Sequence, residues 1–402
     1  MDPVVDSSVG QEFRSVETND ELALACAEWR LADTLAIDTE FMRTNTFYAK
    51  LGLLQVRADE STWLIDPLEI EDWGPFKRLC EEGECEFVLH SCSEDLSVFL
   101  SHFGFLPARI FDTQLAASFL GMGPSLSYAS LVEQSFGVIV DKDATRTDWL
   151  QRPLAEKQLR YAAIDVLHLL ELREMLCAEL RARGLLAFFT AECATLLDAA
   201  ASAEAPENWA EAYLGVGNAW RLDSAGLRVL RALAHWRERV ARSRDKPRSW
   251  IVKDADLYEF AQAAAKVLNQ GTKPLSCEAL SASGALRQVD GQFLSRNAKA
   301  LDALLEDLAA TQTEEPLSPA GPITRQARDE LKSLRRCADD VAHRAGIGSE
   351  ALARKRHLLA FLEVNSPTGE EQRWPTEIAE WKRDLFGDEL WAALASARAG
   401  GS

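Results

Sequence analysis

Apolar and polar residues alternate differently in the two halves of the chain. In the first half, short apolar runs between polar turns predict five strands: "TLAIDTEF" (34–41), "LGLLQVRAD" (51–59), "STWLIDP" (61–67), "CEFVLH" (85–90) and "RIFDT" (109–113). The first three follow one another closely enough to form a meander. Helical spacing occurs in "SEDLSVFLSHFG" (93–104), with Ser93 as the expected N-cap, and in a long segment that ends at Gly184. This order is typical of an α/β domain with a mixed central sheet.

Strand patterns fade beyond residue 205, and helical periodicity rich in Ala, Leu and Arg dominates the second half. The segment "LAATQTEEPLSPAGP" (308–322) has three prolines and no periodic apolar face, so we expect it to separate two helical modules. We therefore predict an α/β domain over residues 1–205, a first all-α domain over 206–308 and a second over 323–402.

The composition favours a packed globular protein of the cytoplasm. Of the 402 residues, 47% are hydrophobic. The segment "MDPVVDSSVG" has neither the basic nor the apolar region of a signal peptide, and no apolar stretch approaches the ~20 residues of a membrane span. The eight cysteines form no CxxC pair. Reduced, buried thiols are therefore favoured over a metal site built from Cys80, Cys85 and His90.

The formal net charge of −19 argues against a general basic surface for nucleic acid. Any binding of nucleic acid must then be local, through basic patches or through metal ions that join acidic residues to phosphate.

Two carboxylates interrupt the first predicted strand. Asp38 and Glu40 are two residues apart, so on a strand they point to the same face. Adjacent carboxylates repel unless a cation or a proton compensates, and hard divalent cations prefer oxygen ligands. Taken alone, the triplet is better explained as solvated residues at a strand end, because the chain has 63 Asp and Glu residues.

Further residues of the same chemistry follow on the expected elements. Asp95 lies in the first turns of the helix after the fourth strand, and Tyr161 and Asp165 are spaced i and i+4, which places them on one helix face. Asp165 is surrounded by Ala, Ile, Val and Leu, where a lone carboxylate is unfavourable. Four acids and a tyrosine in this order predict one site.

These motifs resemble those of the DEDD 3′→5′ exonucleases with a ribonuclease H-like fold, specifically the bacterial ribonuclease D family. "DTEF" matches the first exonuclease motif, "SEDL" the second and "YAAID" the third, and "FYAKLGLLQV", "LIDP" and "IFDTQLAA" are similar as well. The resemblance covers residues 20–180. A related subgroup has His five residues before the last Asp, where this chain has Arg160. Tyr161 therefore indicates the tyrosine subgroup.

The resemblance implies two divalent metal ions, Mg²⁺ or Mn²⁺, with Asp38 bridging both, Glu40 and Asp165 completing one site and Asp95 helping to hold the other. In sites of this type the metals generate hydroxide and stabilise the leaving 3′ oxygen, which releases nucleoside 5′-monophosphates. Tyr161 is expected to orient the attacking water or to help deprotonate it. Orientation is favoured, because a phenol with an ordinary pKa of about 10 keeps its own proton at neutral pH.

Four aromatic or apolar residues near the first motif have two interpretations each. The resemblance implies that Phe41 and Met42 bind the terminal nucleotide, with core packing as the alternative for Phe41. Phe47 and Tyr48 have the chemistry to stack on bases, but their place in a strand favours core roles. We expect Asp66 and Asp112 to be structural turn or cap residues.

The helical half resembles the helicase-and-ribonuclease-D C-terminal (HRDC) domain around "HWRERVARSRDKPRSWIVKDADL", and more weakly in "VAHRAGIGSEALARKRHLLAFLE". In the first copy a dense basic stretch predicts contacts to RNA phosphates through six residues: Arg237, Arg239, Arg242, Arg244, Lys246 and Arg248. For the second copy a solvated surface is the favoured interpretation.

The sequence thus predicts a metal-dependent exoribonuclease that trims the 3′ ends of structured RNA, with tRNA precursors as the expected substrate. One alternative is a DNA 3′→5′ exonuclease of the repair type, because the same motifs serve such enzymes. A second is a non-catalytic RNA-binding protein on an exonuclease fold. The intact acidic and tyrosine residues argue against the second alternative.

Overall fold

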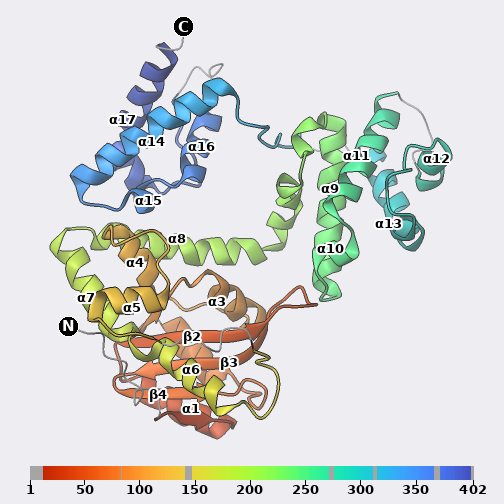
Figure 1. Ribbon diagram of the computed structural model, residues 1–402. Helices are drawn as coiled ribbons and strands as arrows, with labels where there is room; N and C mark the ends of the chain where they lie inside the picture. Colours follow the sequence, from red (N-terminus) through yellow and green to blue (C-terminus); the bar gives the residue numbers. More distant parts are fainter. Residues whose placement is uncertain are drawn as a thin grey trace. The chain divides into compact units, whose positions relative to one another are not determined.

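The computed structural model describes residues 12–82, 84–140, 147–270, 276–310, 315–365 and 372–399 (Figure 1). The chain divides into two compact units. The first contains Met1–Met42, Ala49–Ala201 and Ile323–Ser402, and the second contains Arg43–Tyr48 and Ser202–Pro322. The C-terminal segment thus packs with the α/β part of the chain, and the three domain boundaries given above stay a prediction.

A six-stranded mixed sheet forms the centre of the first unit, and Figure 1 shows β2, β3 and β4 side by side in it. Its order is β1-β4-β3-β2-β5-β6. The pairs β4/β3 and β3/β2 are antiparallel, which confirms the meander, and the other neighbours are parallel. Only the short first strand was not expected from the sequence. The strands are β1 (Arg14–Val16), β2 (Thr34–Met42), β3 (Lys50–Ala58), β4 (Ser61–Ile65), β5 (Glu86–Leu89) and β6 (Ile110–Asp112).

Helices cover this sheet and bury its apolar side chains. Helix α6 packs on β2, β3 and β4, and α7 packs on β2 and β5. Strand residues such as Ile37, Leu54 and Val56 are fully buried. The helices are α1 (Asn19–Trp29), α2 (Gly74–Glu82), α3 (Ser93–Val98), the π-helical turn η1 (Phe99–Phe103), α4 (Thr113–Phe119), α5 (Tyr128–Phe136), α6 (Glu156–Leu167), α7 (Leu169–Ala182) and α8 (Leu186–Glu204).

Two local expectations about these helices are wrong. The N-cap of α3 is Cys92 and not Ser93, which is already helical. The long helical segment that was expected to run to Gly184 is broken at His168 into α6 and α7. At the break, the Tyr128 hydroxyl donates to the carbonyl of Ile164 at 2.9 Å and accepts from the His168 N–H at 3.0 Å. The end of α7 is as expected, because Gly184 adopts a left-handed backbone with φ of 72°.

The described residues of the C-terminal segment contribute four helices to the first unit: α14 (Arg325–Ala345), α15 (Ser349–Leu352), α16 (Lys355–Val364) and α17 (Glu380–Ala399). Buried residues of this segment, such as Leu334, Leu358 and Phe361, belong to the same hydrophobic cluster as the sheet and its helices. Helix α15 packs on α4, where the Gly348 N–H donates to the carbonyl of Phe119 at 2.8 Å.

The second unit is helical and has its own apolar core, with Leu230, Leu233, Leu257 and Phe260 at its centre. Its main helix, α9, packs against α11 and η2. The elements are η2 (Pro206–Gly215), η3 (Ala219–Arg221), α9 (Ser224–Ser243), α10 (Arg248–Ile251), α11 (Asp254–Asn269), α12 (Cys277–Ala282) and α13 (Gly291–Ala310).

Helix α8 is the one described helix that is long and apolar enough to cross a membrane by length and composition. The expectation that no stretch comes close to this length is therefore corrected. A single helix of this kind is weak evidence for a membrane span, because helices of folded proteins pass the same test. Phe189 and Cys193 on α8 are buried in the core of the first unit.

Candidate active site

Strand β2 carries the first two acidic residues on one face of the sheet. Asp38 is paired with Gln55 and Glu40 with Leu53, as the two-residue period requires. The register shifts directly after Glu40, so that Gly52 is an extra residue on β3. A Cβ atom at position 52 would lie 2.6 Å from the Trp149 carbonyl oxygen, so only glycine fits this close approach. The bulge therefore brings the segment around Trp149 against the strand that pairs with the acidic residues.

Helix α3 brings Asp95 to the same site. Its side chain is buried, and Oδ1 accepts a hydrogen bond from Thr39 Oγ1 at 2.5 Å. The loop before α3 is held by Asp112, the N-cap of α4, whose carboxylate accepts from the N–H groups of Cys92 at 2.8 Å and Leu115 at 2.9 Å. Asp112 is thus the structural cap residue that the sequence predicts.

Helix α6 supplies Tyr161 and Asp165 from one face, one turn apart. The Tyr161 hydroxyl is hydrogen-bonded to the Asp165 carboxylate. Burial raises the pKa of Tyr161 above its ordinary value, and the charges of Asp165 and Glu40 raise it further. The phenol is therefore a proton donor and not a base. This electrostatic setting fits the expectation that Tyr161 orients a water molecule.

An arginine holds the segment on which Tyr161 packs. The rings of Tyr161 and Trp149 have centroids 6.2 Å apart. Arg152 donates to the carbonyl oxygens of Trp149 at 2.9 Å and Gly52 at 2.7 Å, and to Asp66 Oδ1 at 2.6 Å. Asp66 also accepts from the Leu68 N–H at 3.0 Å, which is the turn role expected for it.

Three of the four acidic residues form a group with the chemistry of a metal site. Asp38, Glu40 and Asp165 each have a carboxylate oxygen within 4.8 Å of the other two. Burial raises the pKa of each carboxyl, and mutual repulsion adds to the effect for Asp38 and Glu40. Hard divalent cations prefer such oxygen donors and would relieve the repulsion. The donor set therefore fits the cation that the sequence predicts.

The acidic group lies in a pocket of about 440 Å³ that also contains Asp95, Tyr161 and Phe41. Among the described residues that line it there is no Lys or Arg. Burial lowers the pKa of His90, the one histidine of the lining, so this side chain does not supply the missing charge. No basic side chain of the described lining thus compensates the carboxylates, which leaves that role to protons or a cation.

The structure brings together most, though not all, of the residues named from the sequence. Asp38, Glu40, Phe41, Asp95, Tyr161 and Asp165 line the pocket. Met42 instead packs beside Leu53, Leu64 and Trp149. Thr39, Ser91 and Tyr128 also line the pocket, and sequence reasoning did not find them. His90 lines it as well, although the sequence suggested this residue only for the disfavoured site with two cysteines. Of these residues, Thr39 alone could have been found from the sequence, because it is a polar residue at a buried strand position between two acids.

The basic stretch of the second unit is largely engaged within the protein. Arg237 is 5% exposed and paired with Asp254, and Arg242 is 9% exposed and paired with Glu238 and Glu204. Two buried, ion-paired guanidinium groups are not available to phosphates, so the expectation for Arg237 and Arg242 is corrected.

The remaining basic residues divide into paired and free groups. Arg248 Nη2 contacts Glu238 Oε1 at 2.6 Å. Arg239 and Arg244 are exposed and, within the described residues, have no ion pair. Lys246 lies over the ring of Trp250, which is 63% exposed. Arg244 and Trp250 line a pocket of about 380 Å³ together with Lys253 and Arg296.

The two aromatic residues at the end of the strand pair are also structural. Phe47 and Tyr48 donate their backbone N–H groups to Asp245 Oδ1 at 2.9 and 3.0 Å. The Arg242 guanidinium lies 4.6 Å from the centre of the Phe47 ring. Both residues are half-buried in the loop between β2 and β3, so the expectation that they lie in a strand and pack in the core is wrong. Their contacts with Asp245 and Arg242 engage them within the second unit.

Comparisons with known protein families agree with this description of the two units. A 3′-5′ exonuclease family matches residues 13–181, and the HRDC domain family matches residues 226–268. The chain is 39% identical to ribonuclease D of Pseudomonas paraeruginosa over 386 residues, which cover 96% of this chain and 98% of the relative. It is 35% identical to ribonuclease D of Escherichia coli over 378 residues, which cover 94% and 97%.

Solved structures resemble this fold as well. The crystal structure of Escherichia coli RNase D, described as an exoribonuclease involved in structured RNA processing, matches with a TM-score of 0.81 and 34% identity. The match covers 96% of this chain and 99% of that protein. A protein from Bifidobacterium adolescentis matches with a TM-score of 0.59 over 95% and 97% of the two chains, and its 20% identity shows similarity of fold alone.

Proposed function

We propose that this chain, which belongs to the ribonuclease D family of 3′→5′ exoribonucleases, trims structured RNA from the 3′ end. The proposed substrate class is tRNA precursors. The observation that carries the proposal is the group formed by Asp38, Glu40 and Asp165, three carboxylates within 4.8 Å in a pocket lined by Tyr161. The expected products are nucleoside 5′-monophosphates.

Asp38, Glu40 and Asp165 are the proposed ligands of the first of two divalent ions, Mg²⁺ or Mn²⁺, and Asp38 with Asp95 would hold the second. When bound, such ions supply Lewis acidity for phosphodiester hydrolysis. The chain itself contributes the placement of the ligands. The Thr39 hydroxyl donates to Asp95 and thereby fixes one carboxylate oxygen of α3 relative to β2.

Tyr161 is proposed to orient the attacking water through its hydroxyl group. The raised pKa of this phenol keeps its proton in place at neutral pH, so it acts by position. Phe41 lines the same pocket and is proposed to pack against the 3′-terminal base. For Met42 this role rests on the family resemblance alone.

The second unit is proposed to anchor the body of a structured RNA through the basic residues that remain from the basic stretch. These are the exposed Arg239 and Arg244 and the half-buried Lys246, and the exposed Trp250 beside Lys246 offers a ring on which a base can stack. This surface compensates locally for the acidic character of the whole chain.

The cytoplasm remains the proposed location of the protein.

The test is degradation of a 5′-labelled tRNA precursor with a 3′ trailer, beside a DNA strand of the same sequence. We expect a ladder of products shortened one nucleotide at a time from the 3′ end, on RNA, with Mg²⁺ or Mn²⁺ and not with EDTA. Asp38→Asn should abolish the ladder, and Asp198→Asn, at an exposed position of α8, is the matched control.

Any other result of this assay would contradict a particular part of the proposed function. Laddering of DNA alone would indicate a DNA exonuclease. Binding of RNA without cleavage would indicate an RNA-binding protein on an exonuclease fold. Full activity in a metal-free preparation would contradict the assignment of the three carboxylates.

A further inference from the structure

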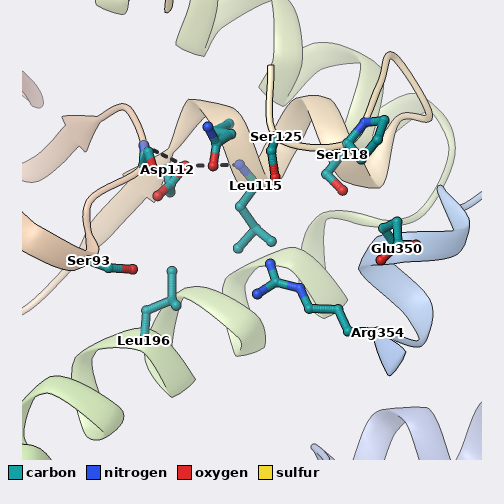
Figure 2. A pocket seen from close by; sticks show the side chains of 11 residues that line it. Ser93, Asp112, Leu115, Ser118, Ser125, Leu196, Glu350 and Arg354 are labelled. Atoms are coloured by element: carbon teal, nitrogen blue, oxygen red, sulfur yellow. Dashed lines mark hydrogen bonds between the residues drawn. The ribbon is translucent and has the colours of Figure 1, made fainter. Parts of the chain in front are cut away.

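A second polar pocket of the first unit lies where the C-terminal segment packs on the α/β part. It has a volume of about 280 Å³. The α/β part contributes Ser91, Ser93, Ser118 and Ser125, and the segment around α15 contributes Glu350 and Arg354. Figure 2 shows the Arg354 side chain extending from the start of α16 into the pocket, toward Leu115.

The pocket offers hydrogen-bond donors that the protein does not use itself. Within the described residues, the Arg354 guanidinium has no hydrogen bond or ion pair, and the four serine hydroxyls have no hydrogen-bond partner. Ser91 and Ser125 also have left-handed backbones, with φ of 61° and 51°. Non-glycine residues adopt this conformation rarely, and it tends to occur at functional sites.

The acidic groups of the pocket are already engaged. Glu350 Oε1 accepts from Arg335 Nη2 at 2.8 Å. Asp112 is 4% exposed, and its carboxylate accepts backbone N–H groups, as described above. Arg354 is therefore the charged group of the lining that remains available, among the described residues, for a ligand. A guanidinium beside several hydroxyls is suited to a phosphate group.

The pocket is next to the site of the three carboxylates. Ser91 lines both pockets, and the first turn of α3 carries Ser93 on one side and Asp95 on the other. An RNA strand whose 3′ end occupies the acidic pocket has further phosphates upstream, and each of them is repelled by the carboxylates. A cation directly beside the acidic pocket offsets this repulsion.

The positive charge continues along the start of α16. Lys355 and Arg356 follow Arg354 and are exposed. The pKa of the buried His357 reflects the same charges. Burial lowers this pKa, and the cations Lys382, Arg356 and Arg354 lower it further, to about 3. This surface is therefore locally basic in a chain with a net charge of −19.

We propose that the Arg354 pocket binds a backbone phosphate of the RNA strand, upstream of the nucleotide that is removed. The C-terminal segment then guides the substrate strand beside the active site, and is not only a solvated surface as its sequence suggests. This inference rests on the proposed function, because it presupposes an RNA strand in the acidic pocket.

The test replaces single phosphates of a short single-stranded RNA by neutral methylphosphonates and measures affinity with Mg²⁺. The proteins are Asp38→Asn, which prevents cleavage, and the same protein with Arg354→Ala or Arg336→Ala. Arg336 is exposed on α14 of the same segment and is outside the pocket, so Arg336→Ala is the matched control for charge. Thermal unfolding verifies that each variant folds.

We expect Arg354→Ala to weaken RNA binding about tenfold, the effect of losing one charge-assisted contact, and to lower the salt slope by somewhat under one unit. One methylphosphonate position should weaken binding by the parent protein and have no further effect in Arg354→Ala, because the two changes remove the same contact. Arg336→Ala should keep the parent affinity and the parent profile.

Equal affinity and an equal methylphosphonate profile in Arg354→Ala would overturn the inference. So would an effect of Arg354→Ala on the affinity for free nucleoside monophosphate without any effect on RNA affinity, because the pocket would then bind a free nucleotide. The wild-type chain, in which Asp38 is intact, is assayed for RNA degradation in parallel. If it degrades no RNA, the proposed function fails, whereas degradation with an unchanged Arg354→Ala profile rejects this inference alone.

Discussion

Asp165→Asn is expected to make the metal-free protein more stable and the metal-bound protein less stable than the wild type. The substitution keeps the shape of the side chain and removes one of three charges that lie within 4.8 Å of one another. In the wild type, the carboxylates repel one another until protons or cations neutralise them. The sign of the effect should therefore depend on the metal.

The distance sets the size of this effect. Two ionised carboxylates 4.8 Å apart repel by about 3.5 kcal/mol at an effective dielectric constant of about 20. Asp165 faces two such partners, so with all three groups ionised at this separation the repulsion would be about 7 kcal/mol. The raised pKa values show that proton uptake relieves part of the repulsion. We therefore expect a gain of about 1–3 kcal/mol for the metal-free variant near pH 8.

Metal binding should reverse the order of stability. A ligand that binds the native state at a concentration one hundred times its dissociation constant stabilises it by about 2.7 kcal/mol. The wild type should gain an amount of this order from Mg²⁺ or Mn²⁺, and Asp165→Asn should gain much less because a ligand is missing.

The assay is thermal unfolding near pH 8, in EDTA and in excess Mg²⁺ or Mn²⁺, with Asp198→Asn as the control for loss of a distant exposed charge. A lower stability of Asp165→Asn in EDTA would show that the three carboxylates do not repel one another as the geometry requires. An equal stabilisation by metal in both proteins would show that Asp165 is not a ligand.

Four further predictions follow from named contacts. Tyr161→Phe should slow single-turnover cleavage by roughly 10²-fold without changing RNA affinity, because the ring stays and the orienting hydroxyl is lost; a rate within twofold of the wild type would assign the hydroxyl a structural role. Gly52→Ala should destabilise the protein by roughly 1–3 kcal/mol in urea unfolding, since its Cβ would lie 2.6 Å from the Trp149 carbonyl oxygen, whereas Gly215→Ala, with open space around it, should have little effect. The double change Arg239→Glu and Arg244→Glu should weaken tRNA binding and flatten its salt dependence, measured by titration at several salt concentrations; an unchanged slope would place the anchor elsewhere. The folded pKa of His357 is about 3, below the ordinary value of 6.5, so the unfolded state binds the extra proton between these values and stability is lost as pH falls through this window. His357→Gln should flatten the dependence of the unfolding midpoint on pH there, and an unchanged slope would refute this assignment.

The sequence alone determined those features that depend on local periodicity. The two-residue period of a strand places Asp38 and Glu40 on one face, and the i, i+4 spacing of a helix places Tyr161 beside Asp165, whatever the rest of the chain does. Short apolar runs with polar turns between them likewise predicted five of the six strands. Such patterns can be read directly, because each residue's partner is a fixed number of positions away.

Tertiary structure decided what each polar side chain contacts. Arg237 and Arg242 belong to a stretch that is basic in sequence, yet they are buried and paired, and the Glu204 partner of Arg242 is 38 residues away. The break at His168 depends on Tyr128, 40 residues upstream. Arg354 faces serines of the α/β part because the C-terminal segment shares the core of the first unit. Burial and long-range pairing determine whether a charge is structural or available to a ligand, and neither has a fixed spacing along the chain.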